Sequence, residues 1–167
     1  MDDRPVGMFD SGFGGLTVAR AVIDLLPAED LVYVGDTGRY PYGPRPLGEV
    51  GEFARQITRT LVHDFDVKLV VVACNTASAA ALEDLRFESD VPIVGVIAPG
   101  ARSAVMATRN GRVGVIGTVG TIASGAYQRE VAGLRPSPSV ALTCAACPGF
   151  VEFVERGEIA SEQVHVL

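Results

Sequence analysis

Apolar residues along the chain alternate between two kinds of spacing. Six short runs rich in Val, Ile and Leu predict strands at 6–9, 31–35, 68–73, 92–97, 112–117 and 139–143. Six longer segments carry apolar residues at helical intervals: 15–26, 47–63, 76–86, 99–109, 119–133 and 148–156. This alternation is typical of a parallel sheet covered by helices. The sequence therefore predicts an α/β fold built from parallel-sheet βαβ units with helices on both faces.

The segment 112–123 repeats the strand-to-helix layout of 5–18. This repetition predicts a nearly complete first unit over 1–97 and an incomplete, similar second unit over 98–167. In such folds ligands bind at the carboxyl ends of the strands. Polar residues gather directly after the predicted strands: Asp10, Ser11, Asp36, Cys74, Asn75, Thr76, Thr118 and Thr121. We therefore expect one crevice to collect them.

Composition narrows the class of partner. A hydrophobic content of 48% with 20% charged residues is typical of a compact globular protein. The net charge of −6, with 14 scattered Lys and Arg residues, disfavours nucleic-acid binding, since phosphate contacts need clustered cations. The apolar stretch after the acidic start is too short for a signal peptide, and no run is long enough to span a membrane. We expect a cytoplasmic protein with a small solute as its partner.

The stretch FDSGFGGLTV, residues 9–18, places an acid and a hydroxyl at a strand end, followed by glycines and a helix. Glycines allow a ligand to approach the backbone, and free N–H groups at a helix start favour an anion. The alternative is a tight turn in which Asp10 only caps the helix. The spacing does not match the dinucleotide fingerprint G-x-G-x-x-G. Asp36 after the second strand still suits a dinucleotide, which remains a competing interpretation.

Cys74 lies at the predicted end of the third strand, directly before a helix. This setting predicts a thiol pKa lowered from about 8.5 towards neutrality. The alternative is a small buried hydrophobic residue, but the neighbouring Asn75 and Thr76 offer donors to an anion. A Cys–His nucleophile has little support, because neither His63 nor His165 follows a predicted strand.

Three further stretches can be explained either by a functional role or by ordinary packing and solvation. The CAAC stretch, residues 144–147, has redox or metal half-site spacing, but no second pair of ligands accompanies it, so we expect local packing and no metal site. The stretch RYPYGPRP, residues 39–46, is either turn chemistry or the wall of a ligand site. Glu152 and Glu155 on the last helix belong to a solvated face unless one of them points into the crevice.

Several motifs together resemble the glutamate racemases of the aspartate/glutamate racemase family. They are FDSGFGGLTV, YVGDTGRYPYG, VVVACNTASAAAL, PIVGVIAPGA, VGVIGTVGTIASGAY and ACPGFVEFVERG, and they follow one another along essentially the whole chain. The resemblance implies a cofactor-independent isomerase that interconverts L- and D-glutamate and supplies D-glutamate for peptidoglycan. Aspartate racemases share the paired cysteines but begin with a different glycine-rich turn. An aspartate or other amino-acid racemase is therefore an alternative, as is a non-catalytic anion-binding or regulatory remnant.

The resemblance assigns roles to individual residues. Cys74 is implied as one of two catalytic thiols, and Asp10 as a group that tunes or relays protons beside it. Glu155 matches an acidic position near the opposite side of the site, whereas Cys147 matches a cysteine that is not the second catalytic thiol, and Cys144 has no implied role. The implied substrate-binding residues are Asp10, Ser11, Pro41, Tyr42, Gly43, Cys74, Asn75, Thr76, Thr118 and Thr121.

Inversion without a cofactor requires an acid or base on each face of the α-carbon. The family supplies the second thiol from a Gly-Cys-Thr-His-like segment, which these 167 residues do not contain. We therefore expect the 167-residue chain alone not to racemise glutamate, and the full-length protein to form a homodimer. We also expect Cys74 to be a more reactive thiol than Cys144 or Cys147.

Overall fold

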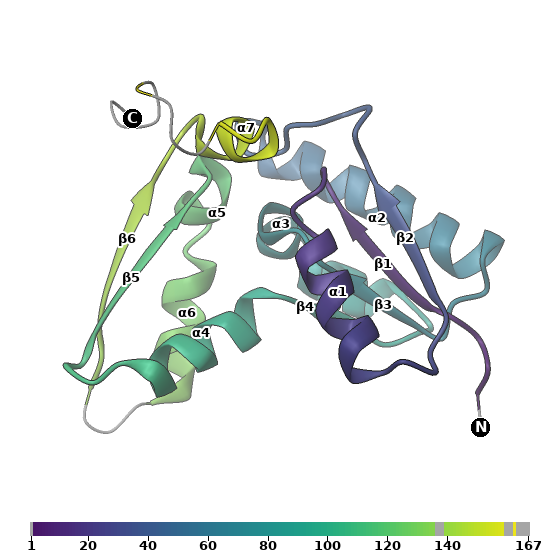
Figure 1. Cartoon of the computed structure of the whole chain (residues 1–167), viewed down its shortest axis with the longest axis horizontal. Helices are drawn as coiled ribbons and strands as arrows, with labels where there is room; N and C mark the ends of the chain where they lie inside the picture. The colour runs from purple at the N-terminus through teal and green to yellow at the C-terminus, as the bar shows by residue number, and fades with distance from the viewer. Residues whose placement is uncertain (1, 136–138, 159–161, 163–167) are drawn as a thin grey trace.

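The first of two parallel sheets contains four strands. The computed structural model describes residues 2–135, 139–158 and 162 (Figure 1). The strands are β1 (Val6–Asp10), β2 (Leu31–Gly35), β3 (Leu69–Val72) and β4 (Ile93–Gly95), in the order β2-β1-β3-β4. Every neighbouring pair is parallel. The α/β class and the parallel pairing predicted from the sequence are therefore confirmed.

Helices cover both faces of this first sheet. Consecutive side chains of a strand point to opposite faces, and Met8 and Phe9 of β1 are both 0% exposed. Met8 packs on the side of helix α1 (Leu16–Leu25). Phe9 packs on the side of α2 (Leu47–Asp64) and α3 (Asn75–Glu88). We call this sheet with its three helices the first region.

The second region begins at α4 (Ile97–Ala107) and contains a two-stranded parallel sheet. Its strands are β5 (Arg112–Gly117) and β6 (Ala141–Ala146), and its other helices are α5 (Val119–Ala123), α6 (Ala126–Leu134) and α7 (Phe150–Glu155). Figure 1 places α4, α5 and α6 on the same side of this sheet. On the other face, all of the strand residues in the described part of the chain are exposed: Arg112, Gly114, Ile116, Ala141, Thr143 and Ala145. Within the described residues, helices therefore lie on one face of this second sheet.

Two boundaries in the second region differ from the prediction. The segment predicted as one helix over 119–133 is broken between α5 and α6, because Gly125 has a φ of +68°, outside the helical range. The last strand runs to Ala146, so Cys144 lies inside β6, where it pairs in register with Val115, rather than after the strand.

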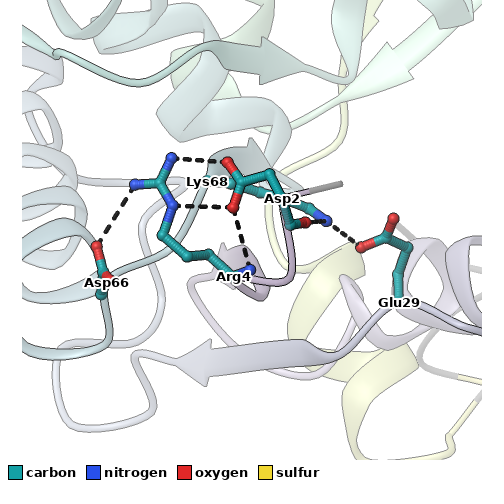
Figure 2. Close-up of polar contacts among 5 residues, drawn as sticks. All are labelled: Asp2, Arg4, Glu29, Asp66 and Lys68. Carbon is teal, nitrogen blue, oxygen red and sulfur yellow. Dashed lines mark hydrogen bonds and ion pairs between the residues drawn. The ribbon is translucent and has the colours of Figure 1, made fainter.

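An ionic network fastens the start of the chain at the amino ends of β1 to β3 (Figure 2). Arg4 binds Asp2 at 2.8 Å and Asp66 at 3.4 Å. Lys68 binds the carbonyl of Asp2 at 2.7 Å and also pairs with Glu29. Hydrogen bonds from Arg4 lower the pKa of Asp2 to about 2. This network lies at the edge of the sheet opposite the carboxyl ends of the strands.

None of the described helices combines the length and apolar character that crossing a bilayer requires.

Candidate functional site

A cleft of about 500 Å³ opens at the carboxyl ends of β1, β3 and β5, between the two regions. It collects every site residue predicted from the sequence: Asp10, Ser11, Pro41, Tyr42, Gly43, Cys74, Asn75, Thr76, Thr118, Thr121 and Glu155. The single crevice expected from the strand ends is therefore present, although Asp36, which was also expected in it, does not line it. Helix α7 lies between the upper ends of the two regions in Figure 1.

Asp10 ends β1 and is only 6% exposed. Its Oδ2 accepts a hydrogen bond of 2.8 Å from the backbone N–H of Gly15, the residue before α1. A Cβ atom at Gly15 would lie 2.6 Å from the Cβ of Asp10 and 3.1 Å from that of Ala73, so this close approach requires glycine. Asp10 thus holds the helix start, as the capping alternative expected, while it also lines the cleft.

Cys74 follows β3 and is the N-cap of α3, with 5% of its surface exposed. Its Sγ accepts the N–H of Ala77 at 3.4 Å, and its thiol donates to Ser11 Oγ at 3.7 Å. Burial raises the pKa of Cys74 to about 11, and the negative charge of Asp10 adds to this rise. Hydrogen bonds from Ala77 and Ser11 oppose the rise without cancelling it.

The predicted low pKa of Cys74 is therefore wrong for the ligand-free protein. The N–H of Ala77 at the helix start lowers the thiol pKa as expected, but burial of the thiol and the charge of Asp10 raise that pKa by more than the hydrogen bonds of Ala77 and Ser11 together lower it. The thiol is also buried, whereas Cys144 and Cys147 are half-buried. Cys74 is thus a neutral thiol when the cleft is empty.

Three threonine hydroxyls join the two regions at the base of the cleft. Thr76 Oγ1 lies 3.0 Å from Thr118 Oγ1 and 3.2 Å from Thr121 Oγ1, and the last two are 3.0 Å apart. Thr118 also caps α5 by accepting the N–H of Thr121. Beside them, the N–H of Gly120 donates to the carbonyl of Gly43 at 3.2 Å. These contacts fix the position of the second region against α3 and the loop over 36–46.

The loop over 36–46 forms one wall through Pro41, Tyr42 and Gly43. Its Tyr42 is buried and donates its hydroxyl hydrogen to Asp36, and burial raises the pKa of this tyrosine. Arg39 pairs with the same carboxylate at 2.6 Å. Asp36 is therefore engaged inside the loop and does not line the cleft. The dinucleotide alternative needs this carboxylate for a ribose, so it loses its main support.

The ring of Phe53 on α2 packs against three side chains of this loop. The guanidinium carbon of Arg39 lies 4.4 Å from the ring centroid of Phe53, and that of Arg45 lies 5.4 Å away. The ring of Tyr42 is 5.5 Å from the same centroid. These cation–π and aromatic contacts hold the wall, and of the four residues only Tyr42 lines the cleft.

Glu155 of α7 reaches across to the glycine-rich turn. Its Oε1 accepts the N–H of Phe13 at 3.1 Å, and a Cβ atom at Gly12 would lie 2.5 Å from the same oxygen. Burial, together with the charges of Glu155 and Glu152, raises the pKa of Tyr40 to about 12. Glu155 therefore faces the cleft and not a purely solvated surface, and Glu152 lines the cleft as well.

The remaining candidate groups divide between the cleft and other places. Cys147 lines the cleft, whereas Cys144 does not. His63 is exposed on α2, away from the cleft, and His165 lies outside the described residues. Within the part of the chain that the structure describes, no group of three or more His, Cys, Asp or Glu residues is placed to hold a metal.

Sequence reasoning missed Tyr127, which lines the cleft from α6. Its hydroxyl donates to Oδ1 of Asn75 at 2.7 Å, across the boundary between the regions. Tyr127 belongs to one of the motifs quoted above, but it does not follow a strand directly. No local signal in the sequence marks it as part of the site.

Comparisons with known proteins all find racemases. A family model described as Asp/Glu/Hydantoin racemase matches residues 16–165. The chain is 53% identical over 164 residues to a glutamate racemase of Corynebacterium diphtheriae, covering 98% of this chain and 60% of the relative. It is 58% identical over 160 residues to a glutamate racemase of Mycobacterium leprae, covering 96% of this chain and 57% of the relative. The chain thus spans less than two thirds of the length of these relatives.

Solved structures give the same result. A glutamate racemase isoform from Bacillus anthracis matches with a TM-score of 0.89 and 41% identity, covering 98% of this chain and 62% of that chain. Glutamate racemase from Francisella tularensis in complex with D-glutamate matches with a TM-score of 0.88 and 35% identity, covering 99% of this chain and 61% of that chain.

Proposed function

The chain belongs to the Asp/Glu/hydantoin racemase family, and we propose that it forms the part of a glutamate racemase that binds glutamate and supplies one of two catalytic thiols. The observation that carries this proposal is the buried thiol of Cys74 beside the carboxylate of Asp10, in a cleft lined by hydroxyl, amide and backbone N–H donors. Cytoplasmic synthesis of D-glutamate for peptidoglycan, without a cofactor, is the role proposed for the full-length protein.

Glutamate offers two carboxylates and an ammonium group to the cleft. We assign its anionic groups to the donors of Ser11, Asn75 and Thr76 and to the backbone of the loop at Tyr42 and Gly43. Asp10 is proposed to face the ammonium group, because its Oδ2 already accepts one N–H and a carboxylate has further acceptor sites. Proximity of opposite charge favours both ionised forms.

The proposed step moves one proton at the α-carbon. The bond between the α-carbon and its hydrogen breaks, the hydrogen leaves as a proton to the sulfur of Cys74, and its electron pair stays on the carbon. A second acid on the opposite face then donates a proton to that carbon, which inverts it. In the reverse direction the neutral thiol of Cys74 is the donor and becomes a thiolate.

The raised pKa of Cys74 sets a condition on this step. A neutral thiol can donate its proton directly, but it must lose that proton before it can act as a base. We propose that the ammonium group of bound glutamate favours the thiolate, because an opposite charge within about 4–6 Å stabilises the ionised form. The thiol then releases its proton to water, and becomes a thiolate, only when substrate occupies the cleft.

The second acid is proposed to be a cysteine of the family's Gly-Cys-Thr-His-like segment, in the full-length homodimer. Within the described residues the competing group is Cys147, which lines the cleft. Cys144 does not line it and provides a matched control. The 167-residue chain is expected to exchange the α-hydrogen of one enantiomer of glutamate without inverting it.

The test follows each enantiomer of glutamate in deuterated water by NMR of the α-proton and by circular dichroism. The expected result is slow exchange without inversion, lost in Cys74→Ala and retained in Cys144→Ala. Racemisation that Cys147→Ala abolishes would make Cys147 the second acid. Exchange of aspartate in preference to glutamate would favour the aspartate alternative. Thermal stabilisation by NAD but not by glutamate would overturn the proposal.

A further inference from the structure

Asn75 presents its side-chain amide at the cleft in a defined orientation. It is the first residue of α3, it is exposed, and it lines the cleft. Its Oδ1 is occupied by the hydrogen bond of 2.7 Å from the hydroxyl of Tyr127. A primary amide has one acceptor oxygen and a nitrogen that carries two donors. Among the described residues Nδ2 has no protein partner, so both of its N–H groups are free for a ligand.

Tyr127 is itself held in place by the second region. It is half-buried on α6, its hydroxyl is protonated at neutral pH as an ordinary tyrosine is, and burial raises its pKa further. A Cβ atom at Gly100 of α4 would lie 3.6 Å from the tyrosine hydroxyl and 3.9 Å from its ring. These are ordinary van der Waals distances, so Tyr127 passes close beside α4 on its way to Asn75.

We infer that Tyr127 is a positioning residue that orients the Asn75 amide so that its Nδ2 donates to a carboxylate in the cleft. An unrestrained asparagine amide can present oxygen or nitrogen to the same point. If Oδ1 of Asn75 faced the ligand, it would repel a carboxylate. If Nδ2 faces the ligand, its N–H groups bind the carboxylate. Tyr127 removes the first orientation by occupying Oδ1. The choice of glutamate as the ligand rests on the proposed function.

The inference also gives the second region a role in binding. The amide belongs to the first region and the hydroxyl that orients it to the second, so the donor is set correctly only when the two regions are seated together. The threonine contacts at the base of the cleft maintain that seating. Tyr127 acts through Asn75 and is not assigned a contact of its own with substrate.

The test is a double-mutant cycle on the 167-residue chain, with D-glutamate binding measured by titration calorimetry. Asn75→Ala is expected to weaken binding about 10- to 100-fold, because it removes hydrogen bonds to a charged group. Tyr127→Phe keeps the ring and is expected to weaken binding about 2- to 12-fold, the range of one neutral hydrogen bond. The double variant is expected to bind no more weakly than Asn75→Ala. Gln128→Ala, exposed on the same helix, is the matched control and should bind as the unmodified chain does.

Three results would overturn the inference. Equal and additive losses in the double variant would mean that Tyr127 contacts the ligand itself. Unchanged binding in Tyr127→Phe would mean that the orientation of Asn75 does not depend on it. If Tyr127→Phe lowers the thermal stability but not the affinity for glutamate, Tyr127 only joins the two regions and does not orient Asn75 for binding.

A measurement without ligand separates this inference from the proposed function. The side-chain amide resonances of Asn75, assigned by their loss in Asn75→Ala, are followed in proton–nitrogen NMR spectra of the unliganded chain. Tyr127→Phe is expected to shift them and Gln128→Ala to leave them in place. If the chain fails to bind glutamate but this shift occurs, the proposed ligand is wrong and the orienting contact stands. Unmoved resonances in Tyr127→Phe overturn the contact whatever the ligand is.

Discussion

The first and second regions pack their parallel sheets in different ways. In the first region both faces of the sheet are covered, and Phe9, Val70 and Val72 are completely buried. In the second region one face of β5 and β6 is exposed, and Ile116 is 67% accessible. Parallel sheets are normally buried on both faces. The described chain therefore combines one fully enclosed core with one that is half enclosed.

The difference bears on how the site is built. Cys74 and Asp10, the groups proposed for proton transfer, lie at the ends of strands from the enclosed sheet. The second region supplies Thr118, Thr121, Tyr127 and Glu155, whose contacts reach across to the first. The enclosed sheet thus carries the reacting groups, and the second region lines the same cleft and contacts their neighbours.

Matched substitutions in the two sheets give the largest expected difference. Val72→Ala in β3 removes a fully buried side chain and should lower the free energy of unfolding by about 2–3 kcal/mol. Val115→Ala in β5, which is half-buried, should cost about 1 kcal/mol or less. Urea denaturation of each variant checks this. Equal losses at both positions would show that the second sheet is as well enclosed as the first.

The buried thiol should make the stability of the protein depend on alkaline pH. The folded pKa of Cys74, about 11, exceeds the value of about 8.5 for an unfolded cysteine. The unfolded chain therefore loses this proton first, so stability is fully present below about pH 8.5 and falls as pH rises towards 11. One such group accounts for at most about 1.4 kcal/mol per pH unit.

Urea denaturation from neutral to alkaline pH measures this loss. Cys74→Ala should reduce the slope, whereas Cys144→Ala in the second region should leave it unchanged. The raised pKa values of Tyr33 and Tyr40 give slopes of the same sign, so the difference between unmodified chain and variant isolates the thiol. Identical slopes in the two variants would contradict the buried, neutral Cys74.

Alkylation rates compare the reactivity of individual cysteines in the two regions. At neutral pH, Cys74 is expected to react more slowly than Cys147, because Cys74 is buried and its pKa is raised. Asp10→Asn should lower the pKa of Cys74 and speed its alkylation, since the charge of Asp10 adds to the rise. Mass spectrometry of the modified peptides across a pH series gives both rates. Faster alkylation of Cys74 than of Cys147 at neutral pH would restore the activated thiolate expected from the helix start.

The ionic network of Figure 2 should have the smallest effect. Lys68→Met removes a partly exposed cation from Glu29 and should cost at most about 1 kcal/mol of stability. Because salt screens such pairs, the cost should shrink at high ionic strength. Thermal unfolding at low and high salt measures it. If Lys68→Met lowered the free energy of unfolding as much as Val72→Ala does, the prediction of a weak, solvent-exposed ion pair would be wrong.

Local patterns in the sequence were sufficient for the strands, the parallel sheets and most of the cleft. The apolar runs indicate strands because they are short and rich in β-branched residues, and a parallel strand buried on both faces has consecutive apolar residues. In a parallel sheet the carboxyl ends lie at one edge, so Asp10 and Cys74 are brought together by topology alone. Thr118 follows a strand of the second sheet, and its place in the cleft depends on how the two regions pack. The break at Gly125 was not predicted, because the surrounding apolar spacing is compatible with one continuous helix and the positive φ depends on the packing.

Only the tertiary structure decided the electrostatic state of the thiol and the contacts between the regions. The position of Cys74 before a helix predicts a lowered pKa, but burial depends on side chains far apart in the sequence, and here it outweighs the helix start. The hydrogen bond from Tyr127 to Asn75 joins residues 52 positions apart, and that from Phe13 to Glu155 joins residues 142 apart. The chemical character of a residue is local, whereas its solvation and its partners are set by the fold as a whole.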